Sequence, residues 1–185
     1  MGCAGRCLYY NYTMMSAATI TIRPYRPDDW DELWRRVVKP VFRGGDTYLV
    51  PPDVSREQAW RFWVEEHPEV FVSIDLNSSD EERITGSYYL KPNYVGQGDH
   101  VANCGYMVAP EARGRGIASA MCEHSKEAAR QRGYRAMQYN FVVSTNTAAV
   151  RLWRKHGFAI VGTLPGVFRH PDHGYVDACV MHTWL

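Results

Sequence analysis

Hydrophobic and polar residues follow short, well-separated patterns in the first half of the chain. Apolar residues recur every three or four positions after Pro27 and predict a helix that ends at Pro40. Residues 41–54 are rich in glycine and proline, which predicts a loop. The other expected elements here are strands at 19–23, 70–74 and 83–90, and a helix at 55–67 that begins with the capping pair Ser55 and Gln58.

The second half alternates strand patterns with helix patterns. Strands are expected at 100–108, 136–143, 158–161 and 176–184, with helices at 116–132 and 147–156. Strands joined through a helix run parallel, so the sheet should be mixed, with antiparallel hairpins elsewhere. The fold class is therefore α/β, with a single domain at 16–185. Residues 1–15 lack the apolar core of a signal peptide and are expected to be a disordered leader.

Composition narrows the possible partners. The chain has 185 residues, of which 45% are hydrophobic, and 21 Lys+Arg against 20 Asp+Glu give a formal net charge of +1. Bulk attraction to nucleic acid or to a membrane surface is therefore weak, and neither is expected as a partner. The five cysteines are scattered, and Cys104, Cys122 and Cys179 lie in apolar runs. This usage favours reduced thiols in a cytoplasmic protein, and no metal site is expected.

The segment between the strand at 100–108 and the next helix carries the clearest chemical signal. Gly114 and Gly116 alternate with Arg113 and Arg115 just before the helix. Glycine allows positive φ and a close approach of the backbone, and a helix start presents unsatisfied N–H groups to an anion. A phosphorylated cofactor is expected here. The segment fits neither a P-loop, which needs Lys-Ser/Thr after its last glycine, nor a Rossmann turn, which needs an acidic residue about 20 positions later.

The pattern Arg-Gly-x-Gly-x-Ala resembles the acetyl-CoA pyrophosphate loop of the GNAT family of N-acetyltransferases, and residues 146–158 resemble the helix and Gly-Phe block of that family. The resemblance implies the GNAT fold, a central mixed sheet flanked by about four helices, and acetyl-CoA as co-substrate. It also implies that the pantetheine arm pairs like an extra strand with main-chain groups. The implied cofactor contacts are Met107, Val108, Arg113, Gly114, Arg115, Gly116, Ile117, Ala118, Asn146 and Trp153.

The chain departs from the common acid–base pair of the family. Many members carry a Glu on the strand before the loop and a Tyr in the last helix, whereas residues 100–108 contain no carboxylate and Trp153 occupies the Tyr position. Asn103 and Asn140 stand in apolar strands instead. They either bond to neighbouring backbone or hold the acceptor amine and carboxylate and position a water. Tyr106 is either a core aromatic or the proton donor to the departing thiolate.

The asparagine pattern is similar to the yeast L-azetidine-2-carboxylate (proline-analogue) N-acetyltransferase branch, which also lacks the Glu/Tyr pair. We expect acetyl transfer to a small-molecule amine of amino- or imino-acid type, by direct transfer in a ternary complex. The alternatives are an antibiotic or polyamine acetyltransferase, and a CoA-binding sensor without transfer activity. A homodimer is the default assembly, and residues 42–52 could form a lid over the acceptor pocket.

Overall fold

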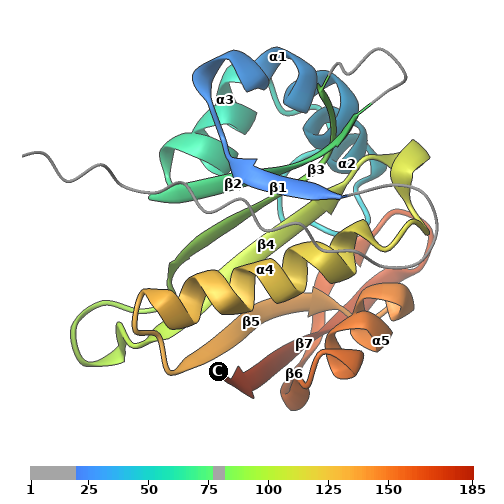
Figure 1. The fold of residues 1–185 in the computed structure, drawn as a ribbon. Helices are drawn as coiled ribbons and strands as arrows, with labels where there is room; N and C mark the ends of the chain where they lie inside the picture. The colour runs from blue at the N-terminus through green and yellow to red at the C-terminus, as the bar shows by residue number, and fades with distance from the viewer. Residues whose placement is uncertain (1–19, 77–81) are drawn as a thin grey trace, which may run out of the picture.

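A computed structural model describes residues 20–76 and 82–185, so the predicted leader lies outside the described residues. Seven strands of this part of the chain form one sheet in the order β1-β2-β3-β4-β5-β7-β6 (Figure 1). Only β4 and β5 are parallel, because α4 connects them; every other neighbouring pair is antiparallel. The mixed α/β sheet is therefore confirmed. The strands are β1 (Thr21–Pro24), β2 (Glu69–Leu76), β3 (Glu82–Pro92), β4 (Val101–Val108), β5 (Ala136–Val143), β6 (Ala159–His170) and β7 (Gly174–Trp184).

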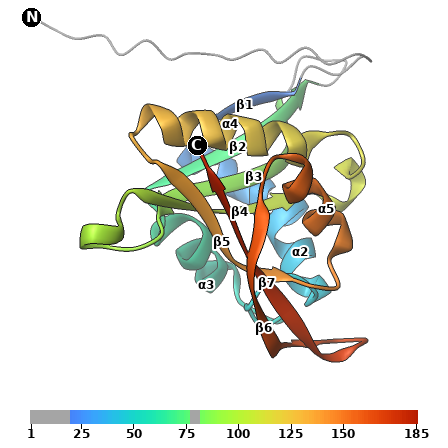
Figure 2. The ribbon, with the colours of Figure 1, turned by 90° about the horizontal axis from the view of Figure 1, so that it is seen from below.

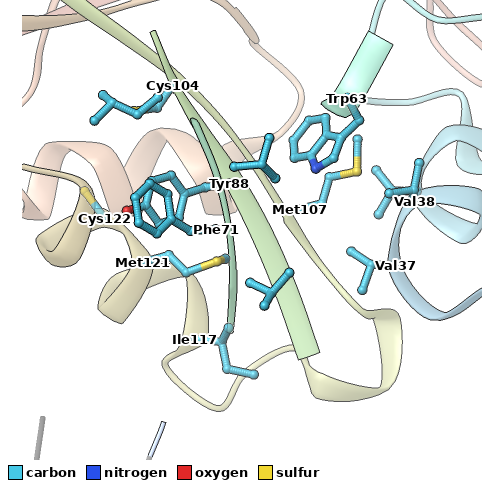
Figure 3. Close-up of a cluster of buried hydrophobic side chains, with 14 of the residues drawn as sticks. Val37, Val38, Trp63, Phe71, Tyr88, Cys104, Met107, Ile117, Met121 and Cys122 are labelled. Carbon is cyan, nitrogen blue, oxygen red and sulfur yellow. The ribbon is translucent and has the colours of Figure 1, made fainter. Parts of the chain in front are cut away.

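Helices cover both faces of the sheet. A 3₁₀ turn (Pro27–Asp29), α1 (Trp30–Leu33), a π-helical segment (Trp34–Val38) and α2 (Lys39–Gly44) follow one another without a break, and α3 (Arg56–Trp60) continues as a π-helical segment (Arg61–Glu65). The second half contributes α4 (Ile117–Gln131) and α5 (Thr147–Lys155). Met107, Val38 and Trp63 pack on one side of β4, and Met121 and Cys122 of α4 pack on the other (Figure 3).

Two predicted boundaries are wrong. The first helix continues through Pro40 and ends at Gly44, so the first part of the predicted loop is helical. The π-helical turn before Pro40 shifts the backbone hydrogen bonds, and the continuous helix accommodates a residue without an N–H donor at this junction. Strand β6 is also much longer than predicted. Gly162, Pro165 and Gly166 lie within it, and β6 is an edge strand whose register shifts absorb them.

A buried ion pair fastens β1 to the first helix. Arg23 is 6% exposed and donates from Nη1 and Nη2 to the two carboxylate oxygens of Asp29, each at 2.8 Å. The backbone N–H of Arg26 also donates to Asp29, at 2.6 Å, and Arg23 Nε donates to Glu82 at the start of β3. Burial alone would raise the pKa of Asp29, but these hydrogen bonds hold the pKa below its usual value.

We predict that Asp29→Asn lowers the free energy of unfolding by about 3 kcal/mol at pH 7, because it leaves Arg23 buried without its main counter-ion. The pKa of Asp29 is lower in the folded chain than in the unfolded chain. Its contribution is therefore full above about pH 4 and is lost as pH falls through the folded value. Urea unfolding at pH 7 and pH 3 measures both effects. Asp31→Asn is the matched control, since Asp31 pairs with Arg56 in solvent and should contribute little. An equal loss in the two variants would contradict the prediction.

Candidate active site

The parallel strands β4 and β5 separate soon after they begin. They pair only at Val101 with Ala136 and at Ala102 with Met137. Beyond these two pairs the facing edges of the strands diverge and line a cleft of about 690 Å³. Its other walls come from residues 46–49, the end of β3 and the start of α5. The backbone edge of β4 from residue 103 to residue 108 is therefore open to an extended ligand.

The glycine loop lies at one end of this cleft. Gly114 and Gly116 have φ of 77° and 83°, the left-handed conformation that favours glycine, and Gly116 is the N-cap of α4. Among the described residues, no backbone hydrogen bond outside the helices and strands uses the N–H groups of residues 114–116. Arg113 lines the cleft, whereas Arg115 is tied to Asp75 of β2. The loop thus presents N–H groups and one cation to an anion.

Three aromatic side chains form the floor of the cleft. The ring of Tyr106 lies 4.8 Å from the ring of Trp153, and the ring of Tyr139 lies 5.0 Å from it. The Tyr106 hydroxyl is 2.9 Å from the Tyr139 hydroxyl and 2.7 Å from Ser125 Oγ on α4. Burial raises the pKa of Tyr106 well above its usual value, so this hydroxyl stays protonated. Burial likewise raises the pKa of Cys104, which therefore remains a thiol.

The two strand asparagines have different environments. Asn103 is 6% exposed, and its Nδ2 donates to the backbone carbonyl of Gln138 at 2.8 Å, where the strands begin to separate. This contact is the bond to neighbouring backbone that the sequence offered as one of two alternatives for Asn103. It leaves Asn103 Oδ1 available to accept another hydrogen bond. Asn140 bonds to side chains instead. Its Oδ1 accepts from Gln138 Nε2 at 2.8 Å and its Nδ2 donates to Asn93 Oδ1 at 2.6 Å.

The remaining predicted cofactor contacts surround the cleft or its loop. Asn146 is the N-cap of α5, where its Oδ1 accepts from the N–H of Ala149 at 3.1 Å, and it also lines the cleft. Met107 and Ile117 are 1% and 2% exposed. Because their side chains are buried in the core, they could touch a cofactor only through the backbone. Val108 lines the cleft, and Ala118 lies in the first turn of α4.

The sequence placed residues 42–52 over a pocket but singled out no individual side chain of this wall of the cleft, which includes Asp46, Tyr48, Tyr89, Lys91 and Asn93. Tyr48 donates its hydroxyl to the carbonyl of Tyr106 at 2.8 Å and so fixes the loop after α2 against β4. A Cβ on Gly105 would lie 2.6 Å from the ring of Tyr89, so glycine is what lets that ring rest on β4. A glycine inside a strand was the only available signal for this close approach. Lys91 and Asn93 also line the cleft, and nothing in the sequence marked them.

The described residues give two further findings. Within 20–76 and 82–185, no three His, Cys, Asp or Glu side chains gather as metal ligands, and residues 171–173 form the turn of the β6–β7 hairpin. The same part of the chain has no helix with the length and apolarity needed to cross a membrane. Cys104, Cys122 and Cys179 are buried free thiols, as the sequence predicted.

Comparison with known proteins agrees with this geometry. The sequence pattern of the acetyltransferase (GNAT) family matches residues 30–158. N-acetyltransferase aca1 of Schizosaccharomyces pombe is 28% identical over 148 residues, which cover 74% of this chain and 71% of aca1. The structure of a GCN5-related N-acetyltransferase from Kribbella flavida is similar, with a TM-score of 0.78 and 38% identity over 90% of this chain and 98% of that one.

A phosphinothricin acetyltransferase from Sinorhizobium meliloti, solved in complex with AcCoA, has the same fold, with a TM-score of 0.75 and 20% identity over 90% of this chain and 88% of that one. The family pattern covers most of the described chain, and it includes the glycine loop and the start of α5. The expected GNAT fold is therefore confirmed, and the chain belongs to the GNAT family of N-acetyltransferases.

Proposed function

We propose that this enzyme transfers the acetyl group of acetyl-CoA to the amine of a small molecule of the amino- or imino-acid type, directly and within a ternary complex. The observation that carries the proposal is the open edge between β4 and β5, with an anion-binding loop at one end and a polar wall at the other. A likeness in fold to an acetyltransferase solved with AcCoA supports the choice of cofactor.

The cofactor would be held mainly by backbone. The N–H groups of residues 114–118 would receive the pyrophosphate, with the Arg113 side chain as the nearby cation, since the Arg113 N–H already donates to the carbonyl of Pro110. The pantetheine arm would pair with main-chain groups of Met107 and Val108 as an added strand. Asn146 uses Oδ1 for its helix cap, so Nδ2 is the atom available to the arm. Trp153 would support the arm from the cleft floor.

In the transfer step, the amine nitrogen bonds to the thioester carbon, and the C–S bond then breaks to release the thiolate. The amine must lose a proton, and we assign Asn103 Oδ1 to orient the amine and the water that takes that proton. No carboxylate on β4 serves as base, so the reaction depends on the unprotonated form of the amine. Tyr106, which stays protonated, is our candidate to return a proton to the thiolate.

We also retain the expectation of a cytoplasmic homodimer. Buried free thiols at Cys104, Cys122 and Cys179 suit a reducing compartment. Strands β6 and β7 extend as a hairpin away from the helices (Figure 2). Val161, Val167 and Tyr175 of this hairpin are 59%, 44% and 76% exposed, and such apolar side chains on an edge hairpin favour a second copy as partner.

A screen tests the proposed reaction. Purified protein with acetyl-CoA should release thiol in the presence of small amino or imino acids, and mass spectrometry should find the N-acetylated product. Polyamines and aminoglycosides belong in the same screen. Turnover on those amines alone would replace the proposed acceptor class. Binding of acetyl-CoA without turnover of any amine would favour the sensor.

Gly114→Asp should weaken acetyl-CoA binding at least a hundredfold, because it places a β-carbon and a negative charge in the loop that receives the pyrophosphate. Isothermal titration measures the affinity. Gly133→Asp is the matched control: Gly133 also has positive φ, 82°, but it follows the other end of α4. Unchanged affinity in Gly114→Asp would refute the assignment of the loop.

Asn140→Ala should raise KM for the acceptor about tenfold and leave the affinity for acetyl-CoA unchanged, because Asn140 bonds only to side chains on the acceptor wall. Steady-state kinetics with either substrate varied separates the two effects. A loss confined to acetyl-CoA binding would place Asn140 on the cofactor side instead.

A further inference from the structure

A chain of side-chain amides runs along the acceptor wall and ends in a buried donor. Gln138 Nε2 donates to Asn140 Oδ1 at 2.8 Å, and Asn140 Nδ2 donates to Asn93 Oδ1 at 2.6 Å. Each hydrogen bond fixes which atom of the next amide is the oxygen and which is the nitrogen. Because Asn93 Oδ1 accepts from Asn140, Asn93 Nδ2 is the atom left to bind another group. Among the described residues, this buried Nδ2 has no hydrogen-bond partner. A buried donor without an acceptor is costly, and here it points to a ligand oxygen.

A cation lies beside this donor. Lys91 is two residues before Asn93, and both line the same cleft. Lys91 pairs in register with Asn103 across β3 and β4, and its Nζ lies 5.6 Å from the centre of the Tyr89 ring. It forms no ion pair with any residue that the structure describes. An ammonium and an amide N–H on one wall are suited to a carboxylate.

The loop after α2 supplies the opposite charge to the same cleft. Asp46 lines the cleft and has no cationic partner among the described side chains. The next residue, Thr47, has a buried Oγ1 that is also without a partner in the described chain. Arg113 lines the same cleft next to the glycine loop, where it is assigned to the cofactor, which leaves Asp46 and Lys91 as an anion and a cation for the acceptor. Such a pair is complementary to a zwitterion, and it suits a polyamine poorly because Lys91 would repel it.

We propose that Lys91 and Asn93 bind the carboxylate of the acceptor, so that the acceptor is an α-amino or α-imino acid with a free carboxylate. This inference rests on the proposed acetyl transfer. Asn140 is then a positioning residue that acts through Asn93, and Asp46 attracts the ammonium of the incoming zwitterion. Asn103 remains the residue that faces the amine.

The test compares each α-amino or α-imino acid with its carboxamide and with the amine that lacks the carboxyl group. We expect kcat/KM at least tenfold higher for the acid. For the carboxamide, the intrinsic preference runs the other way, because amidation removes the carboxylate charge, lowers the pKa of the amine and leaves more of it unprotonated. The comparison of the acid with its carboxamide therefore reports binding and not amine reactivity.

Variants locate the subsite. Lys91→Met and Asn93→Ala should each raise KM for the acid about tenfold to a hundredfold, with little change for the carboxamide. Lys91→Gln keeps a polar stem and should behave like Lys91→Met. Lys39→Met, which removes a lysine of α2 outside the cleft, is the matched control and should leave both substrates unaffected. Thermal unfolding confirms that each variant is folded.

The outcomes separate this inference from the proposed function. Equal or better turnover of the carboxamide overturns the carboxylate subsite and leaves acetyl transfer intact. A preference for the acid that survives in Lys91→Met and Asn93→Ala also overturns it, since the carboxylate would then bind elsewhere. If acetyl-CoA binds but neither acid nor carboxamide is acetylated, the proposed function fails and the subsite fails with it.

Discussion

The separation of β4 and β5 after two residue pairs is the constraint on which the site depends. Backbone N–H and C=O groups must be paired or solvated, so two strand edges that diverge leave a ready partner for an extended ligand. The bond from Asn103 Nδ2 to the carbonyl of Gln138 joins the strands where they begin to separate, and Tyr106, Tyr139 and Trp153 fill the space behind the gap. A close-packed aromatic floor keeps the cleft from collapsing.

The charge distribution in the cleft depends on where individual side chains lie and not on the net charge of the chain. The chain as a whole has a net charge of only +1. At the loop end, Arg115 is used to hold the glycine loop to Asp75 of β2, which leaves Arg113 facing the cleft. At the other end, Tyr48 holds the loop after α2 against β4 and so carries Asp46 to the cleft wall. Two fixed loops therefore bring Arg113 and Asp46 to the cleft, and β3 adds Lys91.

Local sequence chemistry predicted the element order, the mixed sheet and the glycine loop. Those features depend on φ preferences and hydrophobic periodicity, which are properties of neighbouring residues. The course of the chain through Pro40 depends instead on a π-helical turn that no single residue signals. Lys91 and Asn103 meet through strand register, and Asn140 reaches Asn93 across the splayed strands. Convergence of this kind is set by tertiary structure, so spacing along the chain did not predict it.

The absence of a carboxylate on β4 fits an anionic acceptor. A glutamate base about 5 Å from a bound substrate carboxylate would repel it by about 3 kcal/mol at the effective dielectric of a partly buried site. The neutral amide of Asn103 avoids that repulsion and still offers an oxygen to the amine. The exchange gives up general-base catalysis by a carboxylate, so proton removal from the proposed acceptor would depend on water held near Asn103. In the proposed carboxylate subsite, a neutral side chain at this position therefore favours binding of the acceptor over the strength of the base.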